Sequence, residues 1–331
     1  MKSVIKQMAN AAVMLALGAA GAGTYLAFLA DMRAARARLL AGSRVVSTAR
    51  GPIEVAEVGE GAAVLVVHGT GGGFDQGMNI ARGFMGEWGE GFRRIAVSRF
   101  GYLRTPMPPV PSSAAQADAL ATLLDTLEVP RAAVIGVSAG AHPTAQFALR
   151  YPEKVEALVL AVPALYTPPE PGAPPATGPP AIITDYVLRS DFLVWLMGRL
   201  APSVLLRAAG APPSVQHDLS PQGRKELVEG FFPASARHAG LIKDIRNAIL
   251  GWPDLPIEEF EMPVLLIGVE DDPYRSAPVV RYSSGRIPGV RAIVLEQGGH
   301  VMAGQERRVQ QEVRTFLGDA HARNKEEESS K

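Results

Sequence analysis

The sequence predicts an α/β protein whose mostly parallel sheet is flanked by helices. Four largely apolar runs of strand length carry this prediction: residues 62–67, 94–98, 132–137 and 155–162. Such continuous runs suit a parallel sheet, because helices cover both of its faces. Helix-like stretches separate the runs, notably residues 113–127 and 139–151, and this alternation is typical of an α/β architecture.

The remaining elements are predicted on either side of this block. A hairpin is expected around Arg50-Gly51-Pro52, with strands at residues 45–48 and 53–58. Two late apolar runs bring the sheet to roughly eight strands, at residues 263–268 and 290–295. Residues 304–317 are predicted as the closing helix, and the charged residues 319–331 as a disordered tail.

The pattern changes between the sixth and seventh predicted strands. Residues 163–180 are rich in proline and lack a helix or strand period, which predicts a stiff linker. Helical segments follow at residues 183–200, 203–209, 220–232 and 237–250. The predicted core is therefore split into residues 43–162 and 256–318, with a helical insertion at residues 163–255.

An apolar segment precedes the core. Residues 11–30 carry no charge and follow Lys2 and Lys6. As a helix they would span about 30 Å, the thickness of a bilayer's hydrocarbon core. A signal peptide cleaved near Ala20-Gly21-Ala22 is the alternative. Residues 25–29 extend the apolar run beyond that site and favour an uncleaved anchor. Residues 1–42 are thus predicted as anchor or signal plus a short helical linker at 34–41.

The side of the membrane stays open in the sequence. The arginines that follow the apolar run favour a cytoplasmic catalytic domain. A short lysine-bearing N-terminus before an apolar helix is instead typical of export signals. The predicted localisation is membrane-anchored or exported.

Composition excludes several classes of function. The chain has 33 basic and 33 acidic residues, so no basic excess indicates a nucleic-acid partner. It has no cysteine, which excludes disulfides, thiolate zinc sites and a cysteine nucleophile. No group of ligands has metal-binding spacing. The glycines after residue 68 miss a dinucleotide fingerprint, because Phe74 fills its last glycine position. No cofactor or metal is predicted.

A serine lies where a strand is predicted to turn sharply into a helix. Ser138 is the centre of Gly136-Val-Ser-Ala-Gly140, directly after an apolar run. Gly-x-Ser-x-Gly in this setting is typical of a nucleophile elbow, where the flanking glycines leave room for a strained turn. Ser138 is therefore the predicted nucleophile.

A serine nucleophile needs a base, usually a histidine that a carboxylate orients. His300 follows a strand that ends in Gly298-Gly299, whereas His321 sits in the polar tail, so His300 is the predicted base. Asp272 lies five residues after Ile267 of another strand and is the predicted acid. Asp271 is the alternative acid, and a solvated acidic turn is the alternative interpretation.

These motifs together resemble the α/β-hydrolase superfamily, in particular its capped bacterial esterases and carbon–carbon bond hydrolases. The resemblance covers roughly residues 43–317 and includes Val64–Gly69, the elbow, the acid loop and Gly298-Gly299-His300. It implies the α/β-hydrolase fold, with residues 163–255 as a helical cap over the active site. The loop at residues 98–105 departs from the family pattern, because Ser98, Leu103 and Thr105 replace an Asp, a Gly and a Ser.

The resemblance also implies an oxyanion hole. Its donors would be the N–H groups of Ala139 and Thr70, with Gly71 as the alternative to Thr70. Such donors stabilise the charge that develops on the carbonyl oxygen, and losing one typically costs about 2.7–4 kcal/mol. By the same resemblance His68 shapes this loop and transfers no proton.

Three residues are predicted to contact the substrate. Gly71 belongs to the glycines that let the backbone approach a substrate carbonyl, and Phe74 follows them directly. A loop cap onto the next helix would explain Phe74 equally well. Trp195 represents a set of large side chains that would line a pocket or simply pack the insertion: Tyr186, Phe192, Trp195, Met197, Phe231 and Phe232.

The predicted function is a serine hydrolase that cleaves an ester or related acyl bond of a small apolar substrate through an acyl-enzyme. The same triad would serve a carbon–carbon bond hydrolase acting on a diketone, which is one alternative. A non-catalytic binding protein on the same fold is the other. The expected partners are a small ester-like molecule and, through the N-terminal segment, a membrane.

Overall fold

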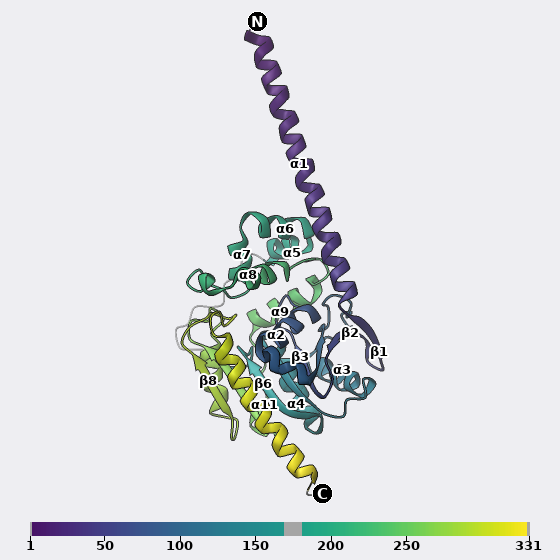
Figure 1. The fold of residues 1–331 in the computed structure, drawn as a ribbon, viewed down its shortest axis with the longest axis vertical. Helices are drawn as coiled ribbons and strands as arrows, with labels where there is room; N and C mark the ends of the chain where they lie inside the picture. The colour runs from purple at the N-terminus through teal and green to yellow at the C-terminus, as the bar shows by residue number, and fades with distance from the viewer. Residues whose placement is uncertain (1, 169–180, 330–331) are drawn as a thin grey trace.

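The core of the molecule is an eight-stranded sheet with strand order β1-β2-β4-β3-β5-β6-β7-β8. The computed structural model describes residues 2–168 and 181–329 (Figure 1). β2 pairs antiparallel with β1 and β4, and all the other pairs are parallel. The strands are β1 Arg44–Thr48, β2 Gly51–Val58, β3 Ala62–Val67, β4 Phe92–Val97, β5 Ala132–Val137, β6 Val155–Ala161, β7 Val264–Val269 and β8 Arg291–Leu295. The predicted fold class is confirmed.

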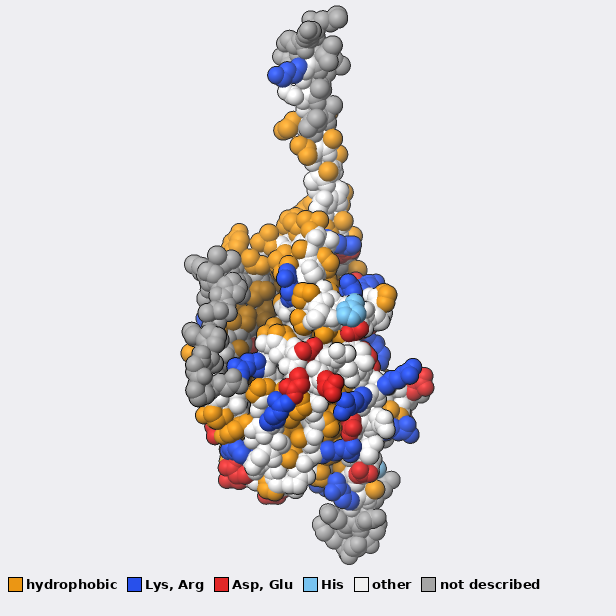
Figure 2. Space-filling view, turned by 90° about the vertical axis from the view of Figure 1, so that its left-hand side faces the viewer, with side chains coloured by type: hydrophobic (Ala, Val, Ile, Leu, Met, Phe, Trp, Pro, Cys, Tyr) orange, Lys and Arg blue, Asp and Glu red, His pale blue; other side chains and the backbone are white. Residues whose placement is uncertain are grey.

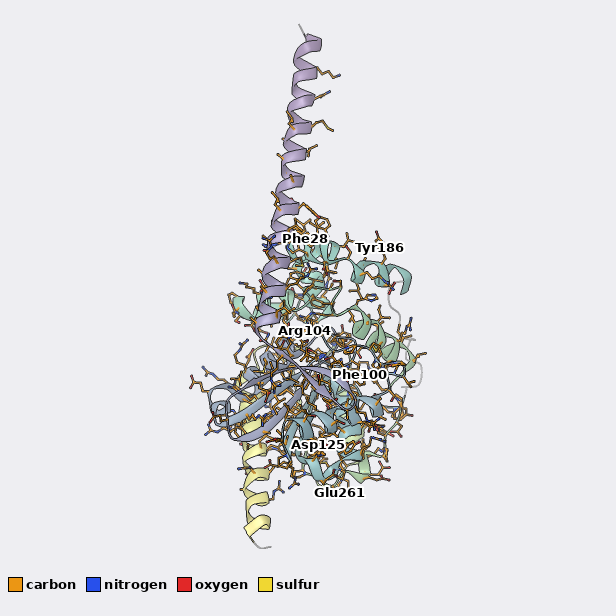
Figure 3. All side chains as sticks on the ribbon, turned by 90° about the vertical axis from the view of Figure 1, so that its right-hand side faces the viewer. Phe28, Phe100, Arg104, Asp125, Tyr186 and Glu261 are labelled. Atoms are coloured by element: carbon orange, nitrogen blue, oxygen red, sulfur yellow. The ribbon has the colours of Figure 1, made fainter. Side chains whose placement is uncertain are left out.

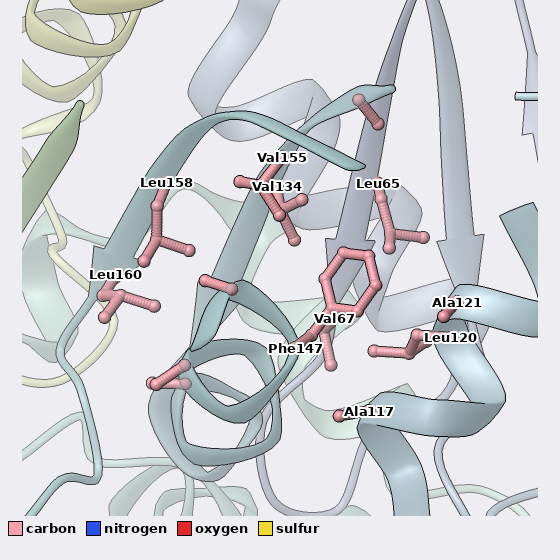
Figure 4. Packing of buried hydrophobic residues seen from close by; sticks show 14 of the residues in the cluster. Leu65, Val67, Ala117, Leu120, Ala121, Val134, Phe147, Val155, Leu158 and Leu160 are labelled. Atoms are coloured by element: carbon pink, nitrogen blue, oxygen red, sulfur yellow. The ribbon is translucent and has the colours of Figure 1, made fainter. Parts of the chain in front are cut away.

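Alternate strand residues bury themselves against helices on opposite faces of the sheet. Leu65 and Val134 face one hydrophobic cluster, and Figure 4 shows them with Phe147 of α4 and Leu120 of α3. Their neighbours in sequence, such as Val66, belong to the cluster on the other face. The core helices are α2 Phe74–Met85, α3 Ser113–Thr126, α4 Ala141–Arg150, α10 Ser276–Ser284 and α11 Glu306–Ser329. Burial on both faces explains why the strands are apolar throughout.

Among the described residues, five α-helices are inserted between β6 and β7, at the place where the sequence pattern changes. They are α5 Ala181–Arg189, α6 Asp191–Leu200, α7 Pro202–Ala208, α8 Pro221–Glu229 and α9 His238–Leu250. The predicted helix 183–200 is two helices, because the Ser190 hydroxyl accepts a hydrogen bond from the Leu193 N–H and so caps the start of α6. Most of the predicted proline-rich linker, residues 169–180, lies outside the described residues.

The C-terminal helix corrects one expectation. Residues 319–331 were predicted as a disordered tail, but α11 continues through Ser329. Ala320 is buried against the core, and His321 Nδ1 lies 2.9 Å from Glu156 Oε1. The charged composition of this segment predicted disorder. The structure instead holds the segment against the core, because the apolar Ala320 lies on the inner face of α11.

The N-terminal segment is one helix, α1 Lys2–Ala41, which projects from the body (Figure 1). Its portion Met14–Ala41 is long and apolar enough to cross a membrane, and the apolar window is not buried in the molecule. Residues 34–41, expected to be a short helical linker, are helical and continue α1 without a break. Met32, Ala35 and Leu39 of α1 are buried against the rest of the protein.

This packing predicts where the segment can be cut. A chain without residues 1–22 should keep the thermal stability of the parent, because the buried side chains of α1 are retained. A chain without residues 1–41 should lose about 2–5 kcal/mol of unfolding free energy, since it leaves the cavity of at least one large core side chain. Thermal unfolding of both proteins checks this expectation, and equal midpoints would contradict it.

Candidate active site

Ser138 lies at a strained turn between β5 and α4. Its φ of 52° falls in the left-handed region, which non-glycine residues rarely adopt. A Cβ on Gly140 would lie 2.4 Å from the His68 carbonyl oxygen, and a Cβ on Gly136 would lie 2.7 Å from Thr144 Oγ1. Both flanking positions therefore require glycine for packing, which is the geometry of a nucleophile elbow.

His300 and Asp272 meet at the ends of β8 and β7. His300 Nδ1 lies 2.8 Å from Asp272 Oδ2. Asp271 has a different contact, because its Oδ1 accepts the Gly299 N–H at 2.8 Å. The structure thus pairs His300 with the predicted Asp272 and uses the alternative, Asp271, to hold the glycine turn that carries the histidine.

The carboxyl group of Asp272 is almost fully buried and is held ionised. Burial opposes its charge, but hydrogen bonds from His300, Ser276 and the Tyr274 N–H outweigh this and keep the pKa of Asp272 below its usual value. An ionised acceptor at Nδ1 assigns the proton of a neutral His300 to that nitrogen. The Nε2 atom is then left unprotonated, as a base requires.

The structure brings the turn after β3 against Ser138. A Cβ built on Gly69 would lie 3.0 Å from Ser138 Cβ and 3.6 Å from its Oγ. Among the described residues, Ser138 Oγ has no hydrogen-bond partner, so the Ser138–His300 bond of the predicted triad is not formed here. Such bonds are often long without substrate and tighten when it binds.

The backbone N–H groups of this turn differ in whether they have a hydrogen-bond acceptor. The Gly71 N–H donates to the Tyr102 hydroxyl at 3.2 Å, and the Gly69 N–H donates to Gln76 Oε1 at 2.9 Å. Within the described part of the chain, the Thr70 N–H has no protein acceptor, and the Ala139 N–H has none outside its own short helix, Ser138–Gly140. Thr70 and Ala139 therefore stay the predicted oxyanion donors, and the N–H of the alternative, Gly71, is engaged.

A buried arginine holds the carbonyl side of the same turn. Arg99, 4% exposed, donates from Nε to the His68 carbonyl at 2.8 Å and from Nη2 to the Gly69 carbonyl at 3.0 Å. Its guanidinium also forms an ion pair with Asp244 of α9, which is 2% exposed. The Tyr102 hydroxyl donates to the same carboxylate at 2.6 Å. The insertion and the turn are thus joined through two buried charges.

His68 is fixed as a neutral structural side chain. Its Nε2 accepts the Arg99 backbone N–H at 3.0 Å, which places the ring proton on Nδ1, 2.7 Å from the Gly69 carbonyl oxygen. Complete burial, reinforced by the charge of Arg99, holds the pKa of His68 well below its usual value. The ring therefore shapes the turn, as expected, and has no nitrogen free for proton transfer.

A second buried arginine clamps the other end of the turn. Arg237 precedes α9 and is 1% exposed; its Nη1 donates to the Gly72 carbonyl at 2.7 Å. Its Nη2 donates to Asp75 Oδ2 at 2.6 Å. Together with the Arg99–Asp244 pair, this contact fixes α9 to the turn at two points.

The network predicts the effect of one small change. Tyr102→Phe removes the acceptor of the Gly71 N–H and a donor to buried Asp244, at a cost of about 1–3 kcal/mol. We expect kcat to fall by roughly tenfold with little change in KM, because a loosened turn misplaces the oxyanion donor. Steady-state kinetics checks this. Tyr25→Phe, which changes an exposed hydroxyl on α1, is the control; equal effects of both would contradict the expectation.

The departures in the loop at residues 98–105 have a structural reason. Glu54 of β2 is 1% exposed and accepts hydrogen bonds from Ser98 Oγ at 2.9 Å and from Arg104 Nε at 2.7 Å. The Thr105 hydroxyl accepts the Glu54 N–H at 2.9 Å. Of the substituted residues, Ser98 thus binds a buried carboxylate from the sheet, and Thr105 binds the backbone of the same residue. Neither Glu54 nor the Arg99–Asp244 pair was singled out from the sequence, because their partners lie 44 and 145 residues away.

Two predicted substrate contacts lie elsewhere. Phe74 begins α2, and its ring is buried with Leu39 and Ala96. Trp195 is also buried; its Nε1 donates to Asp31 Oδ2 at 2.7 Å, and its ring packs on Phe28 of α1. Both assignments were wrong, because these rings complete packing against the N-terminal helix.

Other contacts do line the region around Ser138. Gly71 has φ 77°, and a Cβ there would meet the ring edge of Phe231 at 3.8 Å. Gly210 of the insertion accepts the His300 N–H through its carbonyl at 2.9 Å. The insertion therefore touches the turn and the histidine. The described residues hold no group of three or more side chains arranged to bind a metal ion.

A family model, a curated relative and a solved structure all point to the same family. A family model described as the alpha/beta hydrolase fold matches residues 62–306. Carboxylesterase YbfK of Bacillus subtilis is 26% identical over 286 residues, which cover 82% of this chain and 86% of the relative. A solved alpha/beta hydrolase fold protein from Nakamurella multipartita superposes with a TM-score of 0.67 at 25% identity, covering 83% of this chain and 98% of that one.

A second group of relatives shares a shorter stretch. A 2-hydroxy-6-oxononadienedioate/2-hydroxy-6-oxononatrienedioate hydrolase of Burkholderia vietnamiensis is 36% identical over 100 residues. These cover 30% of this chain and 35% of the relative, so the chain spans about a third of that relative's length.

Proposed function

The chain belongs to the alpha/beta hydrolase family, and from this we propose that it is a serine hydrolase that cleaves an ester or related acyl bond. The observation that carries the proposal is the His300–Asp272 contact at 2.8 Å beside an elbow serine with φ 52°. Nucleophile, acid and base also follow one another in the chain order Ser, Asp, His that this fold uses.

The proposed reaction has two stages. Ser138 Oγ attacks the substrate carbonyl while His300 Nε2 takes its proton, and the ionised Asp272 stabilises the imidazolium. The carbonyl oxygen becomes an oxyanion, which the N–H groups of Thr70 and Ala139 stabilise. His300 then gives the proton to the leaving alcohol, which leaves an acyl-enzyme. Water, deprotonated by His300, attacks the acyl carbon and releases the acid and Ser138.

An ester is favoured over a carbon–carbon bond by the extent of the similarity. The carboxylesterase relative matches 82% of the chain, including the inserted region, whereas the diketone-hydrolase relative matches 30%. The insertion is proposed to be a cap, because Gly210 contacts His300 and Phe231 approaches Gly71. On this proposal residues 43–162 and 256–318 form the hydrolase core, and residues 163–255 form the cap.

The N-terminal helix is proposed to anchor the enzyme in a membrane. Its 20 uncharged residues at 11–30 suit a bilayer in length, and the apolar window is not buried in the molecule.

Two measurements on the detergent-solubilised full chain test the function. A fluorophosphonate probe should label the protein once, at Ser138, because it reacts with activated serines. Hydrolysis of p-nitrophenyl esters of increasing acyl length should show a maximum that reports the pocket size. Labelling without ester turnover would redirect the proposal to diketones, lactones or amides. No labelling and no turnover would overturn it in favour of a binding protein.

A further inference from the structure

Helix α1 contacts the insertion before its apolar run has ended. The ring of Phe192, at the start of α6, lies 6.3 Å from the ring of Tyr25 and 5.2 Å from that of Phe28. Both α1 residues belong to the uncharged run 11–30. At a rise of 1.5 Å per residue, Tyr25 lies about 7.5 Å before the end of that run. A bilayer that contains this run therefore reaches the start of α6.

Polar contacts fix the insertion at this height along α1. Asp31 accepts hydrogen bonds from the Trp195 Nε1 and from Arg199, both in α6. Arg36 Nη2 donates to Asp191 Oδ2 at 2.8 Å. Because α1 is continuous from Lys2 to Ala41, α6 is held at a constant distance from the apolar run.

Apolar side chains are exposed around the place where α1 leaves the body. Figure 2 shows hydrophobic side chains gathered there, and Figure 3 places Tyr186 at the same end of the molecule as Phe28. Leu200, at the end of α6, is 77% exposed, and Tyr186 of α5 is 71% exposed. We call the exposed set the apolar rim; it consists of Tyr25, Leu26, Leu29, Tyr186, Leu200 and Val204. Monomeric proteins rarely expose such clusters without a partner.

Cations stand beside the apolar rim. Arg33 lies three residues after the end of the apolar run, and Arg207 lies in α7 three residues after Val204; both are exposed. Among the described residues, neither side chain has an ion-pair partner. Basic side chains at this level attract the anionic headgroups of phospholipids, and tyrosine is enriched at the same depth. Charge and apolarity thus both fit a lipid surface.

We propose that the apolar rim docks on a phospholipid leaflet, so that the enzyme takes its substrate, a long-chain ester, from that leaflet. The same insertion also reaches the active site just after α7, where the Gly210 carbonyl accepts the His300 N–H. The docking rests on the proposed membrane anchor α1 and on the exposed side chains of α5, α6 and α7. The leaflet-dissolved ester as substrate rests on the proposed function.

Docking is tested by depth measurement on the full chain in vesicles of phosphatidylcholine with phosphatidylglycerol. The chain has no cysteine, so Leu200→Cys and Tyr186→Cys each take one environment-sensitive fluorophore without background. Glu261→Cys is the control, because Glu261 is exposed at the end opposite α1 (Figure 3). We expect blue-shifted emission and quenching by brominated lipids at 200 and 186, and neither at 261.

Two results would overturn the docking. Emission and quenching at 200 and 186 equal to those at 261 would place the rim in water. Pyrene excimers at these sites without lipid quenching would show that a second copy of the chain covers the rim instead. Fluorophosphonate labelling of the same preparations reports the nucleophile separately, so a failed hydrolase proposal is recognised without affecting the depth result.

The substrate source is tested by one charge. Leu200→Glu should lower turnover of a long-chain ester dissolved in the vesicles roughly fivefold, because a charge at the membrane interface opposes docking. The rate for a soluble short-chain p-nitrophenyl ester should not change. Glu261→Gln is the control for a surface substitution. Equal losses on both substrates, or no loss on either, would overturn the leaflet as the source.

Discussion

Replacing Ser138 with alanine is expected to abolish turnover, with kcat reduced on the order of a million-fold, as when other serine hydrolases lose their nucleophile. The residual rate would come from the oxyanion donors and from substrate binding, which the substitution leaves in place. Single-turnover and steady-state assays with a p-nitrophenyl ester measure the loss, and the fluorophosphonate probe should no longer label the protein.

The same variant should keep the stability of the parent to within experimental error. The Ser138 hydroxyl has no hydrogen-bond partner among the described residues, so its removal leaves no buried group unsatisfied. Alanine at φ 52° meets the same backbone strain as serine. An inactive variant with an unchanged thermal unfolding midpoint would show that the loss of activity is not caused by a loss of folding. Residual turnover above about a hundredth of the parent rate would refute Ser138 as the nucleophile.

The variants Asp272→Asn and Asp271→Asn should differ in kcat by orders of magnitude, although the two carboxylates are adjacent in the chain. Asparagine at 272 offers His300 an amide donor or a neutral acceptor and destabilises the required tautomer, so kcat should fall by about 10⁴. Asparagine at 271 still presents a carbonyl oxygen to the Gly299 N–H, the contact that Asp271 makes at 2.8 Å. Its kcat should stay within about threefold of the parent, because a hydrogen bond of similar geometry remains.

The pH dependence of stability in these two variants follows from the ionisation of Asp272. The pKa of Asp272 is lowered in the folded protein, so its ionised form stabilises the fold above the pKa that an unfolded aspartate would have. That contribution is lost as the pH falls through the lowered value. Asp272→Asn should therefore flatten the acid limb of the stability curve, and Asp271→Asn is the reference. A damaging change at 271 with a benign one at 272 would move the acid by one residue.

The sheet, the strained turn at Ser138 and the pairing of His300 with Asp272 could be predicted because their signals are local. Strand runs such as Ala132–Val137 are buried on both faces, and the glycines around Ser138 are required by contacts to the neighbouring strand and helix. His300 and Asp272 each follow a strand, and parallel strands bring their ends together. This placement of residues at strand ends can be recognised in the sequence without knowing how the insertion folds.

What failed depends on contacts between distant segments. Trp195 and Phe74 are apolar rings that suit a pocket as well as a core, and only the position of α1 decides between them. The Arg99–Asp244 pair joins residues 145 positions apart, and no spacing rule relates them. The charged composition of residues 319–329 suggested disorder. The few buried residues that hold α11 against the core hardly change that composition.

The attachment of α9 at two points has an evolutionary consequence. Arg237 and Asp244 tie this one helix to the turn after β3, whereas α6 packs on α1 and α7, and α5 packs on α6 and α9. A lineage that changes either residue is therefore expected to disturb the turn, whereas substitutions on the exposed faces of α5 and α6 leave these two attachments intact.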